Sequence, residues 1–252
     1  METILLLHPL GASRRTWLPV LARLRDRFRV IAPDLPGHGE AAGPFTLGRA
    51  VDVVRRVAAA ETGPLYLVGV SAGATVALLA ALDGDVRVAG LVLSAPIARA
   101  PRSVRLRRAS TAIMPRFALE AAAGRAYAKA PTAQRESAIA EWRRSGRRTI
   151  GAGLCELSGV DLRSRLGRLA VPTLVLCGER DRRSVPVSAV VAGRVPGAEL
   201  RIVPGAGRVW HVTHSDAFAT AVAGFVDARA RAASTAAVPR QRAALSGQPQ
   251  TT

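Results

Sequence analysis

Six short apolar segments, each followed by a stretch with helical periodicity, constrain the fold of this chain more than any other feature. The segments are residues 3–7, 29–32, 65–69, 89–94, 173–177 and 199–203. Most are apolar throughout rather than alternating, which is typical of strands covered by helices on both faces. Between them, residues such as Leu47, Val51 and Val54 have the spacing of one helix face. We therefore predict an α/β fold with a doubly wound, mostly parallel sheet of about six strands.

The alternation of strands and helices stops between residues 96 and 160. This stretch is rich in Ala and Arg and has helical patterns interrupted by Pro115, Gly124 and Pro131. We predict that residues 96–160 form a helical cap inserted after the fourth strand, into a core made of residues 1–95 and 161–231. Residues 232–252 lose all apolar periodicity, so we expect a disordered tail there.

A serine flanked by glycines, in Gly69-Val70-Ser71-Ala72-Gly73, joins the third predicted strand to the next helical segment. A sharp strand-to-helix turn needs small residues two positions before and after its central residue, because the backbones come close together there. Such a turn would project Ser71 above the sheet edge as a nucleophile. The Ala72 amide, at the positive end of the helix, would then face a developing oxyanion.

Two further loops carry a family likeness when they are taken together with this turn. His8-Pro9-Leu10-Gly11 follows the first strand, and Asp34-Leu35-Pro36-Gly37-His38-Gly39 follows the second. In this order the three stretches resemble the α/β-hydrolase superfamily, and enol-lactone hydrolases and small carboxylesterases are nearest in motif order. The resemblance implies a serine hydrolase with a helical cap and makes the Leu10 amide the second oxyanion donor. Pro9 stands where those relatives have Gly, and we expect His8 and His38 to tie loop backbones together.

The remaining members of a catalytic triad are only partly present. Gly178-Glu179-Arg180-Asp181 resembles the Gly-Glu-X-Asp signature of the family, which makes Asp181 the acid that orients an imidazole base. In similar proteins the base directly follows a Gly-Ala-Gly stretch, but here that residue is Arg208. A guanidinium stays protonated far above neutral pH, so Arg208 cannot take a proton from Ser71.

Three interpretations of the missing base remain open. His211, or His214 on the same loop, could reach the base position. The site could instead have lost ordinary turnover, which would leave a binding protein or a very slow enzyme. In the third interpretation, the arginine is peculiar to this copy of an otherwise active hydrolase. We take His211 as the candidate base.

These residues predict an enzyme that cleaves a carboxylic ester, lactone or thioester through an acyl-enzyme. Ser71, Asp181 and His211 would be catalytic, the amides of Leu10 and Ala72 would form the oxyanion hole, and no cofactor or metal is expected. The alternative is a catalytically impaired hydrolase-fold protein that binds a ligand or an acidic partner, because the usual base position is Arg208.

The formal charge of +18 predicts attraction to polyanions. Residues 96–160 alone hold 13 basic and four acidic residues. We therefore expect a small acyl substrate, with an acidic carrier or partner contacted through cap arginines such as Arg105, Arg107 and Arg108. Nucleic-acid binding is disfavoured, because aromatic residues make up only 4% of the chain and no zinc spacing or stacking platform is present.

The two cysteines and the N-terminal segment predict a cytoplasmic protein. Cys155 and Cys177 have no redox or metal-binding spacing, so reduced thiols are expected. The N-terminal segment has no basic leader, and its apolar run is too short for a signal peptide or a membrane span.

Overall fold

The computed structural model describes residues 1–100 and 116–245 and contains a single six-stranded sheet within them. The strands are β1 (Thr3–Leu7), β2 (Arg29–Ile31), β3 (Leu65–Val70), β4 (Gly90–Ser94), β5 (Thr173–Gly178) and β6 (Glu199–Val203). They lie in the order β2-β1-β3-β4-β5-β6, and all five strand pairings are parallel. The prediction of an α/β fold with a parallel sheet is confirmed.

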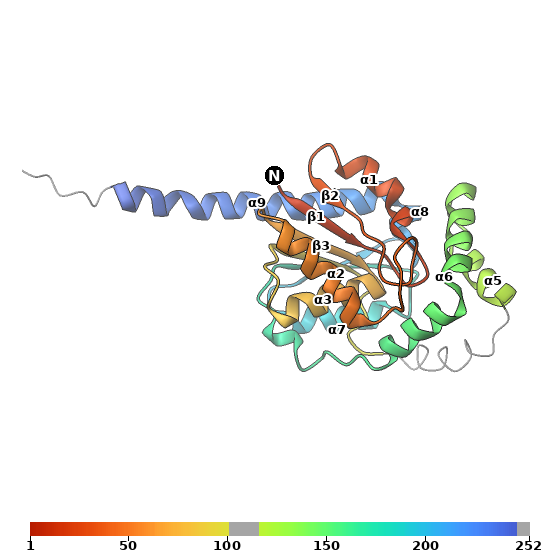
Figure 1. Cartoon of the computed structure of the whole chain (residues 1–252). Helices are drawn as coiled ribbons and strands as arrows, with labels where there is room; N and C mark the ends of the chain where they lie inside the picture. Colours follow the sequence, from red (N-terminus) through yellow and green to blue (C-terminus); the bar gives the residue numbers. More distant parts are fainter. Residues whose placement is uncertain (101–115, 246–252) are drawn as a thin grey trace, which may run out of the picture.

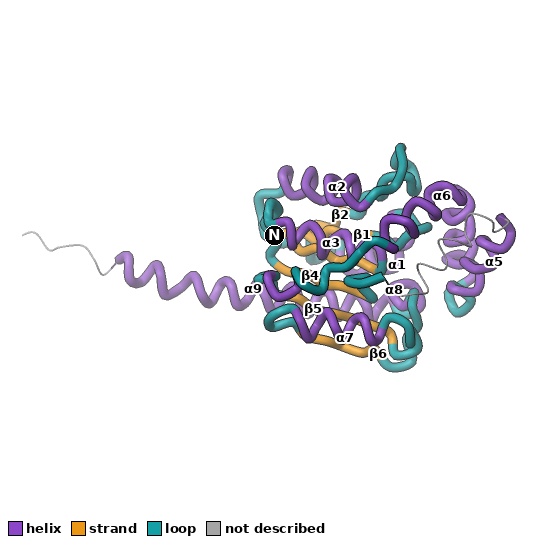
Figure 2. The backbone as a smooth tube through the Cα atoms, turned by 90° about the horizontal axis from the view of Figure 1, so that it is seen from below, coloured by secondary structure: helices purple, strands orange, loops and turns teal. Residues whose placement is uncertain are grey.

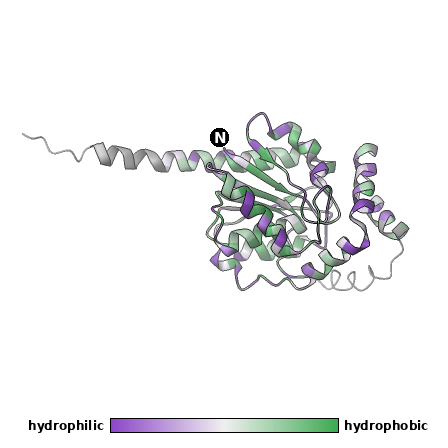
Figure 3. Cartoon of the chain, viewed as in Figure 1, coloured by the Kyte–Doolittle hydropathy of each residue, from purple (hydrophilic) through white to green (hydrophobic). Residues whose placement is uncertain are grey.

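Helices cover both faces of the sheet (Figures 1 and 2). These are α1 (Leu18–Leu24), α2 (Leu47–Ala60), α3 (Ala72–Asp83), α7 (Val185–Arg194), α8 (Trp210–Thr213) and α9 (Ser215–Leu245). The short helix η1 (Arg14–Trp17) directly precedes α1. Another short helix, η2 (Leu166–Arg168), precedes β5. Successive side chains of a strand point to opposite faces. Leu5 and Leu7 accordingly pack in the core with α2, α3 and α7, whereas Ile4 and Leu6 pack with α1 and α9. In Figure 3 the strands of the sheet have mainly hydrophobic colours, whereas the helices around them mix hydrophobic and hydrophilic residues.

A helical cap is inserted between β4 and β5, at the opposite end of the molecule from the far end of α9 (Figures 1 and 2). It contains α5 (Arg116–Ala126) and α6 (Thr132–Ser158). At its base the chain leaves and re-enters the core side by side, through an antiparallel bridge between Arg99 and Asp161. Helix α6 is interrupted at Gly146, whose φ of 68° lies in the left-handed region that glycine adopts without strain. The cap arginines Arg105, Arg107 and Arg108 lie outside the described residues.

Helix α9 differs from the expectation for the end of the chain. A disordered tail was expected from residue 232, but the structure continues the helix to Leu245. Figure 1 shows this part of α9 extending away from the rest of the molecule. The segment is rich in Ala, which has the highest helix propensity, and it prolongs a helix whose first half is packed on the sheet. Pro239 lies within it and removes one backbone hydrogen-bond donor.

The turn between β3 and α3 is packed directly against the end of β1. A Cβ atom on Gly73 would overlap the carbonyl oxygen of Leu7, and one on Gly69 would overlap the backbone of Gly73. Both overlaps are with backbone atoms, which cannot move aside as a flexible side chain can. The two glycines that flank the turn are therefore required by close backbone approach.

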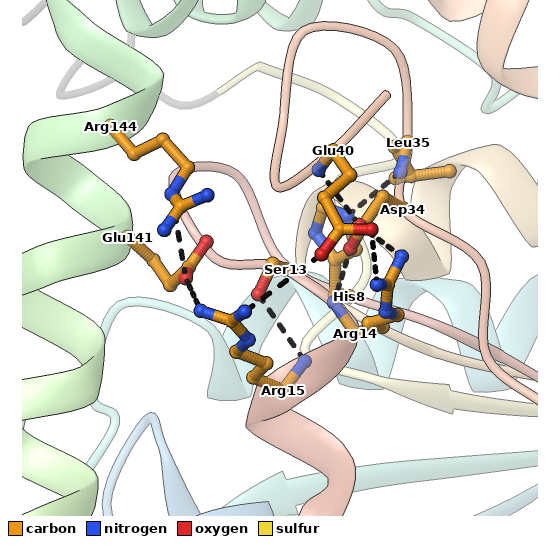
Figure 4. A network of polar contacts seen from close by, with 9 residues as sticks. All are labelled: His8, Ser13, Arg14, Arg15, Asp34, Leu35, Glu40, Glu141 and Arg144. Carbon is orange, nitrogen blue, oxygen red and sulfur yellow. Dashed lines mark hydrogen bonds and ion pairs between the residues drawn. The ribbon is translucent and has the colours of Figure 1, made fainter.

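Two buried histidines hold the loops that follow β1 and β2. The Leu35 amide donates to Nε2 of His8 over 2.9 Å, and the Gly11 amide donates to Nε2 of His38 over 3.0 Å (Figure 4 shows the first pair). The other ring nitrogen, Nδ1, lies within hydrogen-bond distance of a backbone carbonyl in both histidines. The carbonyl belongs to Pro9 for His8 and to Pro36 for His38. Burial lowers the pKa of His8 to about 3 and also lowers the pKa of His38. Both rings are therefore neutral ties between the two loops.

These histidines predict that the fold loses stability in mild acid. An unfolded chain binds a proton at each imidazole near pH 6.5, whereas native His8 does so only near pH 3. The stabilisation is therefore complete above pH 6.5 and is lost as the pH falls, by up to about 1.4 kcal/mol per pH unit for each such ring. Urea unfolding at pH 7, 6 and 5 measures the slope. His38→Gln, whose amide oxygen can still accept from Gly11, should reduce it, and constant stability over this range would contradict the prediction.

Candidate active site

Ser71 stands at the turn between β3 and α3 in a strained backbone conformation. Its φ is 55° and its ψ is −111°. Ser71 and Ala95 are the two non-glycine residues with positive φ in the described part of the chain. Such a conformation costs on the order of 1–3 kcal/mol and persists only where the surroundings enforce it. Here the Ser71 amide donates to the carbonyl of Ser94 on the neighbouring strand over 2.8 Å.

Leu10 lines the same cavity as Ser71, and Ala72 directly follows Ser71 in the chain. Leu10 belongs to the loop after β1, and Ala72 is the first residue of α3. Neither amide hydrogen-bonds to another residue that the structure describes. An N–H group at the first turn of a helix has no partner within that helix, so it is available to a ligand.

Asp181 follows β5, in a loop at the same edge of the sheet. The residue is 8% exposed, and its amide and carbonyl bond to Gly178 and Ser184 within the loop. Its Oδ2 atom is buried and accepts no hydrogen bond from the described residues. Among the described residues, the cationic group nearest to this carboxylate is the guanidinium of Arg208, whose Nη1 lies 3.8 Å from Oδ2.

Arg208 connects the acid to the serine. It lies in the loop between β6 and α8, and its Nη2 donates to Oγ of Ser71 over 3.1 Å. The guanidinium therefore contacts Ser71 on one side and approaches Asp181 on the other. This is the arrangement in which a triad would hold an imidazole. An arginine here can donate hydrogen bonds and positive charge but cannot accept a proton.

The candidate base His211 is placed elsewhere. It lies in α8 with no exposed surface, and its Nε2 is 3.0 Å from Oγ1 of Thr16. Its ring packs on Trp17 and Phe218, with centroids 5.2 and 6.2 Å away. Burial lowers the pKa of His211 to about 3. No hydrogen bond joins it to Ser71 in the described structure, so its predicted role requires a different position of this loop.

His214 is also remote from the serine. Its side chain is exposed, and its Nδ1 contacts the neighbouring Thr213 hydroxyl at 2.8 Å. It does not line the cavity beside Ser71. Of the two histidines considered from the sequence, only His211 reaches the wall of that cavity.

The cavity beside Ser71, here called the Ser71 pocket, has a volume of about 140 Å³ and mostly apolar walls. Leu10 and Val70 contribute from the core, and Ile150, Leu154 and Leu157 contribute from α6 of the cap. Arg208 is the one formally charged residue among the described residues that line it. Ile150, Leu154 and Leu157 were not identified as pocket residues from the sequence. They are four and three positions apart, which places them on one face of a helix.

Tyr127, between α5 and α6, forms another wall of the Ser71 pocket. Burial raises the pKa of its phenol, and the influence of the Thr16 hydroxyl opposes this shift. Thr16 in turn contacts His211. The three side chains therefore lie between the pocket wall and the core.

The described residues show no evident metal site. They contain no group of three His, Cys, Asp or Glu side chains placed to hold a metal ion. Burial raises the pKa of Cys177 to about 11, so this thiol stays protonated, and Cys155 is a free exposed cysteine. No helix in the described ranges has the length and apolar character needed to span a membrane.

Comparison with known proteins confirms the resemblance that the motifs suggested. Residues 4–221 match the family model described as the Alpha/beta hydrolase family. A pimeloyl-(acyl-carrier protein) methyl ester esterase of Stenotrophomonas maltophilia (strain K279a) is 31% identical over 245 residues, which cover 89% of this chain and 93% of that protein. A hydrolase structure from Pseudomonas aeruginosa PA01 has a TM-score of 0.80 at 25% identity and covers 89% of both chains. The enol-lactonase from Burkholderia xenovorans LB400 has a TM-score of 0.77 at 23% identity, covers 90% of this chain and 91% of its own, and shows the same fold. The relatives support a hydrolytic enzyme, and the chain belongs to the alpha/beta hydrolase family.

Proposed function

We propose that this protein is a serine hydrolase that cleaves a carboxylic ester, lactone or thioester, with Ser71 as its nucleophile. The observation that carries the proposal is the positive φ of Ser71 at a turn where a strained backbone holds its side chain beside an apolar pocket. Two amides without a partner among the described residues, those of Leu10 and Ala72, would supply the donors that a tetrahedral oxyanion needs. The esterase name of a relative that matches 93% of its own length agrees with this chemistry.

In the proposed reaction, Oγ of Ser71 attacks the carbonyl carbon and its proton leaves for an acceptor. The carbonyl oxygen becomes an oxyanion held by the Leu10 and Ala72 amides. Collapse of this intermediate expels the protonated alcohol or thiol and leaves an acyl-serine. Water then attacks the acyl-serine, and the acid product departs with Ser71 restored.

Arg208 affects the step in which Ser71 loses its proton. Its guanidinium stabilises the alkoxide form of Ser71 by charge and hydrogen bonding, but it holds no lone pair for the proton. His211 is neutral, but its lowered pKa makes it a weak base, and it would have to leave Thr16 and its aromatic neighbours to reach Ser71. We therefore infer that the resting arrangement turns over slowly and that hydroxide takes the proton. Activity without a general base still benefits from the oxyanion hole.

Replacing the arginine by the residue it displaces should restore fast turnover. We expect Arg208→His to raise kcat/KM for 4-nitrophenyl esters by about a hundredfold or more, because a positioned base contributes on the order of 10²–10⁴. The pH profile distinguishes the mechanisms. Wild-type kcat/KM should rise steadily with pH up to about pH 9, whereas the variant should reach a plateau above the pKa of its new imidazole.

The control variants separate the possible bases. Ser71→Ala should abolish turnover in both backgrounds, and His211→Asn should leave the wild-type rate within about threefold if this ring takes no part in proton transfer. A wild-type plateau near neutral pH that His211→Asn removes would show that His211 is the base after all. No gain in Arg208→His would contradict the assigned position of the base.

The acyl group of the substrate is proposed to be held on an acidic carrier that contacts the cap. The name of the Stenotrophomonas maltophilia relative specifies an acyl-carrier protein as part of its substrate. In this chain the described part of the cap exposes Arg125, Lys129 and Arg135. These cations would attract an acidic carrier over a range set by salt screening.

A carrier-bound substrate should show a salt dependence that a free ester lacks. With Arg208→His as the enzyme, raising NaCl from 50 to 300 mM should lower kcat/KM several-fold for an acyl-carrier-protein ester and leave the matching free methyl ester unchanged. Replacing Arg125 and Lys129 by Gln should weaken the response, whereas Arg87→Gln, exposed at the amino end of β4, should not. Equal salt dependence of the two substrates would refute carrier recognition.

A second candidate function is the binding of a carboxylate without turnover. It is favoured by the hydrogen bond of Arg208 to Ser71, because the Ser71 hydroxyl, two free amides and a guanidinium are all hydrogen-bond donors. A carboxylate has only acceptors and matches such a set, and the apolar walls suit an aliphatic tail.

Binding of hexanoate tests this second candidate. Calorimetry should show that Arg208→Met weakens hexanoate binding about tenfold or more, because hydrogen bonds to charged groups contribute roughly 1.5–3 kcal/mol. The exposed neighbour Arg182, changed to Met, provides the matched control. Unchanged hexanoate affinity in Arg208→Met would exclude this mode of binding.

A further inference from the structure

A second and larger cavity lies between the core and the cap, with a volume of about 360 Å³. Its floor comes from η1 and α1 of the core, and its roof from the first half of α6. Leu18, Pro19, Ala138 and Val212 give it apolar surface. Tyr127 lines both this cavity and the Ser71 pocket and so forms a wall common to the two.

Two side chains of α6 that line this cavity, those of Gln134 and Glu141, each carry a buried oxygen atom. Oε1 of Gln134 and Oε2 of Glu141 accept no hydrogen bond from the described residues. The two residues are seven positions apart, so they lie on the same face of the helix. Glu141 is only 3% exposed, which means that its free oxygen is out of bulk water. A buried acceptor without a donor is costly, and the cost falls when a ligand supplies one.

The other oxygen of Glu141 belongs to an ionic network (Figure 4). Its Oε1 accepts from Arg15 over 3.2 Å, and Nε of Arg144 lies 3.9 Å away. The network continues from Arg15 to Glu40, and from Glu40 through Arg14 to Asp34. Three arginines thus face three carboxylates, and their formal charges cancel.

The charge balance specifies the ligand. A molecule that enters this cavity finds hydrogen-bond acceptors without donors, so it needs an N–H or O–H group. Because the surrounding charges cancel, the molecule needs no positive charge. A carboxylate would place a second anion against Glu141 and is disfavoured. We propose that this cavity is a second ligand site, which binds an uncharged molecule with an apolar body and a hydroxyl or amide donor directed at Glu141 and Gln134. The proposal does not depend on turnover at Ser71.

Two probes of equal composition test the role of the donor. Hexan-1-ol has a hydroxyl donor, and its isomer 1-methoxypentane has an ether oxygen and none. In calorimetric titrations of the full chain we expect hexan-1-ol to bind about tenfold more tightly, the ratio typical of a hydrogen bond to a charged acceptor. Gln134→Met and Glu141→Gln should each reduce this ratio, and Glu136→Gln, exposed on the same helix, should leave it unchanged.

Filling the cavity tests the location. Ala138→Phe should abolish binding of both probes, while Ala140→Phe, on the exposed side of the same helix, should not. Ser71→Ala should bind hexan-1-ol as the wild type does, so loss of binding there would place the probe in the Ser71 pocket and overturn the proposal. Equal affinities for alcohol and ether would also overturn it, because the free acceptors would then be satisfied by water alone. If Ala138→Phe does not fold, the Gln134→Met ratio decides the question.

Discussion

The close packing of the β3–α3 turn against the end of β1 is the constraint on which the rest of the site depends. Leu7 pairs with Gly69 in the sheet, and Gly73 lies against the Leu7 carbonyl with no room for a side chain. This contact places the first turn of α3 beside the loop that carries Leu10. Because parallel strands end at one edge of the sheet, Asp181 after β5 and Arg208 after β6 reach the same place.

Arg208 keeps the connection between serine and acid while it removes the chemistry of a base. The guanidinium contacts Ser71 and approaches Asp181, so the loops remain joined as they would be by an imidazole. A permanent cation, however, occupies this position with donors, and no described residue offers a proton acceptor within hydrogen-bond distance of Oγ of Ser71. Slow ester cleavage and carboxylate binding are therefore the two functions proposed for a site with an arginine at this position, and the rate of proton removal from Ser71 distinguishes them.

Much of this architecture could be predicted from the sequence, because each buried parallel strand corresponds to a short apolar segment of the sequence with clear limits. Observed strand limits lie within one residue of the expected ones, and Ser71, Asp181 and Arg208 were placed by the loops that follow three of these strands. The position of His211 could not be predicted in this way. It is set by the single helical turn of α8, which turns the ring toward Trp17 and Phe218 rather than toward Ser71. The length of α9 also depends on packing of its first half, which local composition does not reveal.

Helix α6 lines both cavities. Gln134 and Glu141 line the larger cavity, whereas Trp142, just before the break at Gly146, and Ile150 and Leu154 after it line the Ser71 pocket. Tyr127 forms a wall of both cavities, and Thr16, which lines the larger one, contacts His211. Any movement of His211 toward Ser71 must break its contact with Thr16. The position of the imidazole therefore affects a residue in the wall of the larger cavity.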